Sequence, residues 1–246
     1  MSQPAVAALE PLPFELVYSD GEPLDSNWHR LQMNLLIDSI FFALKERGRS
    51  DFFIGGDMFV YYSVQQAQEV AQDFAAGRPY FRGPDVFYVG GVEPRPLEER
   101  NAWVAWEEGG RLPDVIVELL SPSTERIDRT VKKDLYARVF RTPEYYLHDV
   151  YNAAFEGFHL VGDVYQPLVP NAHGRLRSEQ LGLEFGLWHG TLMDQEATWL
   201  RLFYPDGRLV PTPAEAGYRR AEAERQRAEA AEAELARLRA RLRAED

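Results

Sequence analysis

The sequence predicts an α+β domain that is followed by a long, charged C-terminal helix. Residues 115–120 form an almost unbroken apolar run, which is typical of a strand covered on both faces. A helical pattern comes next, and a second apolar strand pattern ends at Leu147. Residues 214–244 consist largely of alanine, glutamate and arginine, a composition that favours a long charged helix.

Length and composition restrict the class of protein. The chain has 246 residues and is 45% hydrophobic, which is enough for a large core in one main domain. It has no cysteine, and this excludes disulfides and thiolate metal sites. No apolar run reaches the length of a membrane span, and the N-terminus lacks the pattern of a secretory signal. We therefore expect a cytoplasmic protein without a membrane partner.

The net charge of −12 is unevenly distributed. Residues 214–246 contain eight arginines and eight acids, so the whole negative excess belongs to residues 1–213. Proteins that coat nucleic acids present basic surfaces to phosphate, and this balance argues against such a role. An enzyme with a local basic groove remains compatible with it.

Three segments make up the predicted organisation. Residues 1–13 hold three prolines and no periodic pattern, which indicates a flexible N-terminal arm. Residues 14–212 form the folded domain, and residues 213–246 form the charged helix. Its leucines at 235, 238 and 242 recur at 3-4 spacing, and alanines extend this seam toward the N-terminus. A coiled coil and a homodimer formed through this helix are left open. Their association would be weak, because alanine at most seam positions buries little surface.

The domain begins with a strand, a helix and a second strand. A short strand is expected at 14–18, with a turn at Asp20-Gly21. A helix about 30 Å long follows over 26–47, with Asp25 or Ser26 as its N-cap. The aromatic residues 52–64 predict a strand that bends at Gly55-Gly56. The remaining expected elements are a loop or loose helix at 65–79, a buried strand at 86–89, an irregular connection at 90–111, and hairpins at 153–168, 181–192 and 199–210.

Two acids, Asp85 and Glu118, lie in apolar strand patterns. If the two strands are neighbours, the carboxylates converge, and at about 4 Å they repel by roughly 4 kcal/mol at an effective dielectric of 20. A shared proton or a positive group is then needed. A divalent cation with oxygen ligands meets this need, and Mg²⁺ commonly uses one or two carboxylates with waters and substrate phosphate.

A lysine is expected close to these acids. Lys132 follows Asp128 by one helical turn and precedes Tyr136 by one turn, so the three side chains share a helix face. Lys133 points away from that face by about 100°. Glu118 could also pair with Lys132 in a purely structural contact.

The pattern resembles the Uma family of putative restriction endonucleases, a branch of the PD-(D/E)XK nuclease superfamily. The match runs from about Trp28 to Leu192. Pro84-Asp85-Val86 fits the upstream acid of the family, and His29 falls where the family often has a histidine. The most specific positions are Glu118-Leu119-Leu120-Ser121-Pro122-Ser123-Thr124, Asp128, Lys132, Tyr136 and Glu144-Tyr145-Tyr146-Leu147.

The resemblance implies a restriction-endonuclease-like core of a helix, three antiparallel strands, a helix and a strand. It also implies an endonuclease that binds Mg²⁺ or Mn²⁺ through Asp85 and Glu118 and hydrolyses phosphodiester bonds, with DNA as the expected nucleic-acid partner. The superfamily places its lysine two residues after the acid, where this chain has Leu120. The lysine has moved to the following helix, which makes Lys132 the third catalytic candidate.

Supporting roles fall to Asp57, Asp128 and Tyr136. Asp57 is a candidate third acid, and the other two would position Lys132. Two other functions stay open at this point. One is a non-catalytic interaction protein that keeps the fold and recruits partners through the C-terminal helix. The other is a glycoside hydrolase that uses the two carboxylates as its catalytic pair.

Overall fold

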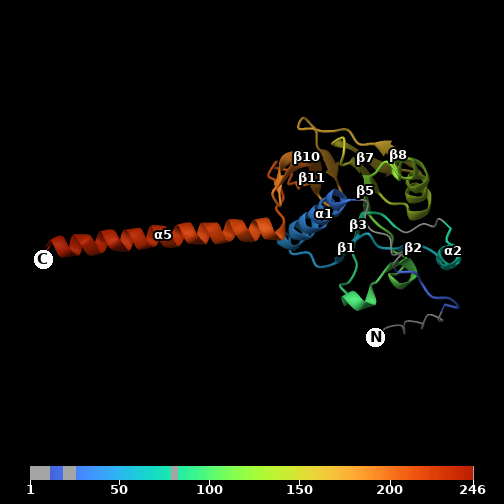
Figure 1. The fold of residues 1–246 in the computed structure, drawn as a ribbon, viewed down its shortest axis with the longest axis horizontal. Coiled ribbons are helices and arrows are strands. Elements are labelled where there is room, and N and C mark those ends of the chain that lie inside the picture. Colours follow the sequence, from blue (N-terminus) through green and yellow to red (C-terminus); the bar gives the residue numbers. More distant parts are fainter. Residues whose placement is uncertain (1–11, 19–25, 79–82, 246) are drawn as a thin grey trace.

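A six-stranded sheet forms the centre of the computed structural model, which describes residues 12–18, 26–78 and 83–245. Its strand order is β1-β3-β5-β6-β7-β8, and only β5 and β6 run parallel (Figure 1). The parallel step needs a crossover, which the helical segment between these two strands supplies. The strands are β1 (Phe52–Gly56), β3 (Val86–Gly90), β5 (Val115–Leu120), β6 (Glu144–Asp149), β7 (Ala154–Val161) and β8 (Val164–Pro167).

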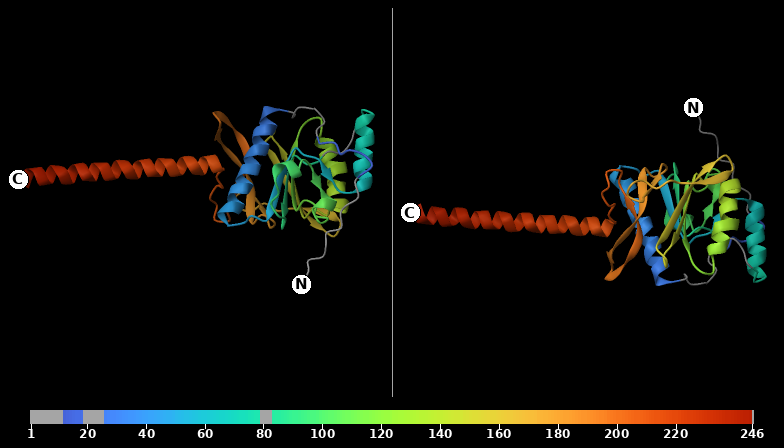
Figure 2. Two further views of the ribbon diagram at one scale, coloured as in Figure 1. Left: turned by 90° about the horizontal axis from the view of Figure 1, so that it is seen from below. Right: turned by 90° about the horizontal axis from the view of Figure 1, so that it is seen from above.

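Helices cover both faces of this sheet (Figure 2). Helix α1 (Asn27–Glu46) packs on one face together with a smaller antiparallel sheet, ordered β11-β10-β9. The crossover segment 125–140 packs on the other face. The smaller sheet consists of β9 (Leu176–Ser178), β10 (Leu183–Leu192) and β11 (Gln195–Phe203).

The sheet is buried on both sides, so its central strands have apolar residues at consecutive positions. Val115 and Val117 belong to the core shared with α1, whereas Ile116 and Leu120 belong to the core under the crossover segment. Glu118 follows the same alternation and therefore points toward the crossover segment. This alternation decides where the acid lies.

Smaller elements surround the central sheet. A parallel pair, β2 (Val60–Tyr61) and β4 (Trp103–Val104), packs with α2 (Val64–Ala75). Two short 3₁₀ turns, η1 (Leu97–Glu99) and η2 (Ala105–Glu107), interrupt the predicted irregular connection. The long helix α5 (Pro213–Glu245) projects from the body. No helix within the described ranges is long and apolar enough to cross a membrane.

The α+β class with a multi-stranded sheet and a C-terminal helix is confirmed, but several local predictions are wrong. Residues 14–18 do not form the expected strand, and the Val17 backbone is held there by hydrogen bonds with the Tyr61 hydroxyl. The single strand predicted at 52–64 is broken, because β1 ends at Gly56, Asp57 has a positive φ, and the chain resumes as β2 only at Val60. Residues 181–192 do not form a hairpin of their own, since β10 pairs along its length with β11 and β9. Residues 1–11 of the arm predicted over 1–13, and the turn at Asp20-Gly21, lie outside the described residues.

Candidate functional site

The register of β3 and β5 places the two acids opposite each other. Val86 pairs with Val117 and Phe87 pairs with Ile116 in an antiparallel ladder. One step further along this register, Asp85 faces Glu118.

Hydrogen bonds connect the two acids through the backbone. The Leu119 N–H donates to Oδ2 of Asp85 over 2.7 Å, and the Asp85 N–H reaches Oε2 of Glu118 at 3.3 Å. Glu118 is fully buried, whereas Asp85 is half-buried and borders the solvent. Each carboxylate is therefore held by the strand that carries the other.

The crossover segment brings a lysine and a tyrosine to this pair. Nζ of Lys132 lies 3.1 Å from Oε2 of Glu118 and 2.8 Å from Oδ1 of Asp128. The Tyr136 hydroxyl donates to Oε1 of Glu118 over 2.7 Å. Five of the six residues predicted for the site thus form one continuous cluster.

The segment that carries Lys132 is wider than an ordinary α-helix. It consists of α3 (Glu125–Ile127), η3 (Asp128–Lys132), α4 (Lys133–Leu135) and η4 (Tyr136–Phe140), and both η segments are π-helical. Single π turns inside α-helices are frequent at functional sites. The widened turns lie where Asp128, Lys132 and Tyr136 face the sheet.

Burial and mutual repulsion shift the pKa values at the site. Burial raises the pKa of Glu118 well above its usual range, and the negative charge of Asp85 adds to this, against the opposing effect of Lys132. Burial also raises the pKa of Asp85, with Lys132 again opposing. For Lys132, burial alone would lower the pKa, but Glu118, Asp128 and Asp85 outweigh it and the pKa rises. The lysine therefore stays protonated at neutral pH.

Three carboxyl groups of the cluster face a single ammonium group, so a shared proton or a cation is needed to balance their charge. A divalent cation would balance this deficit. Among the described residues, no group of three or more His, Cys, Asp and Glu side chains is placed to hold a metal ion. Two carboxylates still suit Mg²⁺, which takes its remaining oxygen ligands from water and substrate. Asp85 and Glu118 fit this donor set, and Lys132 contacts both Glu118 and Asp128.

Asp57, the sixth predicted residue, contacts the site through its backbone. It is exposed, follows β1 at a positive φ of 47°, and its N–H donates to the Asp85 carbonyl over 3.1 Å. This turn fixes the chain next to Asp85.

A histidine from α1 holds the same strand from the other side of the sheet. Nε2 of His29 lies 3.2 Å from the Leu119 carbonyl, which can only accept, so Nε2 carries the proton. Nδ1 lies 2.9 Å from the hydroxyl of Ser26, the N-cap of α1. The backbone of Leu119, the residue that follows Glu118, is thus held at its N–H by Asp85 and at its carbonyl by His29. The sequence offered only the histidine's position in a helix, with no sign of this backbone contact.

His148 on β6 lies beside this arrangement and was not expected to matter. It is fully buried and pairs with Leu119 in the ladder. Nδ1 lies 3.1 Å from the Ala154 carbonyl, and Nε2 has no hydrogen-bond partner in the described part of the chain. Burial lowers the pKa of His148 to about 4.

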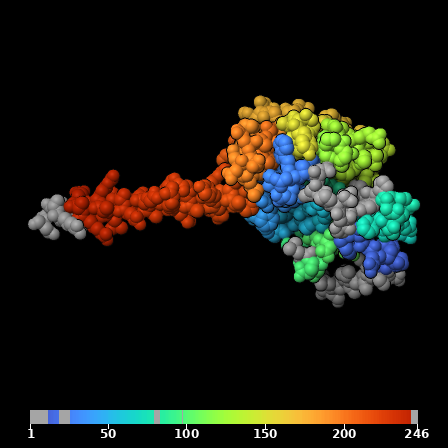
Figure 3. All heavy atoms as spheres, viewed as in Figure 1, coloured from blue at the N-terminus to red at the C-terminus, as the bar shows by residue number. Residues whose placement is uncertain are grey.

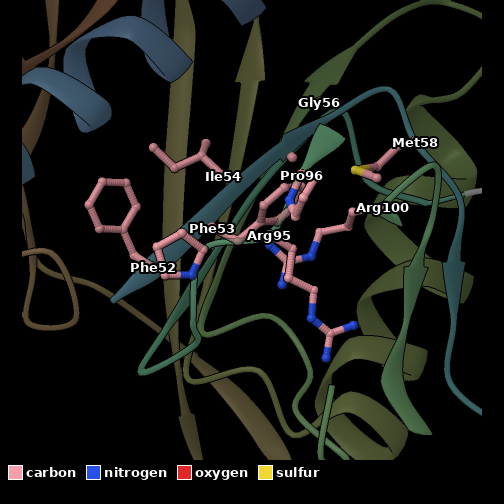
Figure 4. A pocket seen from close by; sticks show the side chains of 10 residues that line it. Phe52, Phe53, Ile54, Gly56, Met58, Arg95, Pro96 and Arg100 are labelled. Atoms are coloured by element: carbon pink, nitrogen blue, oxygen red, sulfur yellow. The ribbon is translucent and has the colours of Figure 1, made fainter. Parts of the chain in front are cut away.

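A pocket of about 400 Å³ lies along β1, the edge strand of the sheet (Figure 4). Its lining residues come from β1, among them Phe52, Ile54 and Gly56, and from the segment after β3, among them Arg95 and Arg100. Both arginines pair with Glu108. The lining includes Gly56 and Met58, the residues on either side of Asp57.

Comparison with known proteins identifies the family. The family model described as Uma2, putative restriction endonuclease, matches residues 8–197, a range that includes all residues of the cluster. No protein with curated annotation matches the sequence. Because the family model covers more than half of the chain, this protein belongs to the Uma2 family of putative restriction endonucleases.

Proposed function

We propose that the protein is a metal-dependent endonuclease that hydrolyses phosphodiester bonds, with DNA as its substrate. The observation that carries this proposal is the convergence of Asp85, Glu118 and Lys132 at one end of β5. Family membership suggests nuclease activity in general. The metal, the substrate and the roles of individual residues are our own inference.

The order of elements supports a restriction-endonuclease-like core. Helix α1 precedes three antiparallel strands, β1, β3 and β5, and the crossover segment then leads to the parallel strand β6. Insertions between these elements form β2, β4 and α2. In this core the candidate acids come from its second and third strands.

Each residue then has a role that follows from its contacts. Asp85 and Glu118 would hold Mg²⁺ or Mn²⁺, which when bound polarises the phosphate and acidifies a bound water. Lys132, protonated and one-fifth exposed, would stabilise negative charge that develops on the phosphate oxygens. Asp128 and Tyr136 hold the lysine and the glutamate in place. Asp57 would contribute by keeping Asp85 at the mouth of the site.

The decisive experiment compares matched variants in a cleavage assay with Mg²⁺ or Mn²⁺ on double-stranded and single-stranded DNA and on RNA. We expect Asp85→Asn, Glu118→Gln and Lys132→Met each to reduce the cleavage rate by about 100-fold or more. Two controls carry the same chemical changes outside the cluster. Glu125→Gln alters an exposed acid of the crossover segment, and Lys133→Met removes the adjacent lysine, whose Nζ lies 3.2 Å from the Phe158 ring centre.

The result that contradicts the proposal is equally clear. If the purified protein leaves every nucleic-acid form intact, and calorimetry detects no Mg²⁺ or Mn²⁺ binding that Glu118→Gln removes, the cluster is not a nuclease site.

One observation favours a non-catalytic alternative. Both carboxylate oxygens of Glu118 are already engaged, one by Lys132 and the other by Tyr136. In an interaction protein that keeps the fold, this contact would be an ion pair with a structural role and no role in catalysis. Partners would then be recruited through α5. Normal partner binding after Glu118→Gln, together with loss of binding after removal of α5, would support this alternative.

A further inference from the structure

We propose that residues 225–242 of α5 form a parallel, two-stranded coiled coil with a second copy of this chain. Helix α5 leaves the body as a single rod in all three views of the molecule (Figures 1, 2 and 3). Every residue from 223 to 241 is exposed. Nothing in the described part of the chain covers this half of the helix.

The interactions within an isolated helix of this kind contribute little to its stability. Ion pairs such as Arg225–Glu229 and Arg225–Glu222 occur along it, but such pairs contribute only weakly. In proteins most helical stability comes from packing of an apolar face against a partner. Leu235 and Leu238 nevertheless remain about half exposed.

The apolar residues of this half form one narrow seam. Ala228, Ala231, Leu235 and Leu238 alternate by three and four residues, and the sequence continues the pattern with leucine at 242. This 3-4 repeat is the pattern of the a and d positions of a coiled coil. Glu224 occupies the preceding seam position and would place a charge inside the pair. The contact therefore begins after Glu224, and the first part of α5 acts as a spacer.

The charged residues beside the seam indicate which partner binds to it. Arg227 and Glu234 lie on one side of it, and Glu232 and Arg239 lie on the other. In a parallel pair each position of the first set faces the residue five positions later on the second chain. Arg227 then meets Glu232, and Glu234 meets Arg239, and symmetry repeats both contacts. Residues 214–246 carry no net charge, so this self-complementary pattern favours a second copy over a strongly charged partner.

The expected association is weak. Two of the five seam layers contain alanine, which contributes little apolar area, so the leucine layers supply most of the contact. The dimer should consequently form only as the concentration rises. Its formation needs neither metal nor nucleic acid, so its failure and the failure of the proposed nuclease activity are distinguishable.

Sedimentation equilibrium of the full chain over a wide concentration range tests the proposal. The wild type should approach twice the mass of one chain. The variant with Leu235→Glu and Leu238→Glu should remain monomeric to a concentration at least about tenfold higher. A control with Ala233→Glu and Ala240→Glu adds the same charges on the outer face of the helix and should behave as wild type. A wild type that stays monomeric throughout, or a dimer that survives the seam substitutions, overturns the proposal.

Cysteine cross-linking tests the parallel arrangement, and the chain suits it because it has no cysteine of its own. Ala228→Cys places a thiol in the seam, where a parallel pair brings the two copies of this residue together. Oxidation should therefore give a covalent dimer, whereas Ala233→Cys on the outer face should not. A dimer in solution that does not cross-link through Ala228→Cys would contradict the parallel arrangement.

Discussion

At the scale of single residues, the central feature is a carboxylate that is completely removed from water. Glu118 has no exposed surface, and its carboxylate is contacted by Lys132, by Tyr136 and by the Asp85 N–H. Burying an ion pair costs desolvation energy that the mutual attraction often does not recover. A cluster of this kind is therefore poor for stability, and its presence is better explained by a chemical role.

The same argument predicts how the pair affects folding. Lys132→Met should lower the free energy of unfolding by about 3 kcal/mol, because it leaves the Glu118 carboxyl buried without its cation. Adding Glu118→Gln to this variant should restore part of that loss, since the uncompensated charge is removed. Urea unfolding of the wild type, both single variants and the double variant measures the coupling. A double variant less stable than Lys132→Met would contradict this explanation.

His148 predicts a pH dependence of stability. Its pKa is about 4 in the folded protein, against about 6.5 in an unfolded chain. The folded protein therefore resists protonation, and the unfolded chain takes up the proton first as the pH falls. Stability from this residue is fully present above pH about 6.5 and is lost toward pH about 4.

Between neutral pH and pH about 5, the loss due to His148 should amount to about 2 kcal/mol. His148→Asn is the matched control, because its amide can still donate to the Ala154 carbonyl but does not titrate. Urea unfolding at both pH values measures the difference between the two proteins. Equal losses in wild type and variant would show that His148 is not the source.

At the scale of elements, the site depends on how three segments are placed relative to one another. Strand β5 supplies Glu118 and the Leu119 peptide, the crossover segment supplies Lys132, and α1 supplies His29. The N-cap Ser26 fixes both the start of α1 and the orientation of the His29 ring. We therefore expect a change in this helix cap to affect the strand that carries the acid.

Two helix caps in this chain allow a direct test of that connection. Ser26→Ala and Ser63→Ala each remove a side-chain cap, of α1 and α2 respectively, and each should cost about 1 kcal/mol of stability. Only Ser26→Ala should also reduce the cleavage rate, because only Ser26 contacts His29. Thermal unfolding and the cleavage assay together check this expectation. Equal activity of the two variants would show that the contact of His29 with the Leu119 carbonyl does not affect cleavage.

At the scale of the whole molecule, α5 is joined to the body by one buried arginine. Arg201 on β11 is completely buried and binds both oxygens of Glu215, at 3.1 and 2.7 Å. Thr212 and Glu215 also exchange hydrogen bonds between backbone and side chain, which is the capping box of a helix start. The first turn of α5 therefore stabilises the domain, although the rest of the helix projects into solvent.

Two truncations separate these roles. Removal of residues 218–246 should leave the free energy of unfolding of the domain nearly unchanged, because it keeps Glu215. Removal of residues 213–246 should lower it by about 3 kcal/mol, since Arg201 would remain buried without its carboxylate. Thermal or urea unfolding of the two proteins measures the difference, and equal stability would contradict the role given to Glu215. This test also bears on the proposed division of the chain at residue 212.

The sequence by itself determined the elements with strong periodicity and the identity of the candidate residues. The long helix α1, the buried strand β5 and the helix α5 follow from apolar spacing and composition, which are local properties. Asp85, Glu118 and Lys132 could be selected because a charged residue in an apolar strand, or on one face of a helix beside such a strand, needs a partner. Their proposed roles stay predictions.

Tertiary structure alone decided how these elements meet. The broken strand at 52–64 and the pairing of β10 with β11 depend on contacts with residues distant in the sequence. Local strand propensity does not include such contacts. The same holds for the contact of His29 with the Leu119 carbonyl and for the burial of Arg201 against Glu215. Every residue has a backbone carbonyl, so the sequence does not indicate which carbonyl a histidine will contact. The sequence also does not distinguish a buried arginine from an exposed one, because burial depends on the tertiary structure.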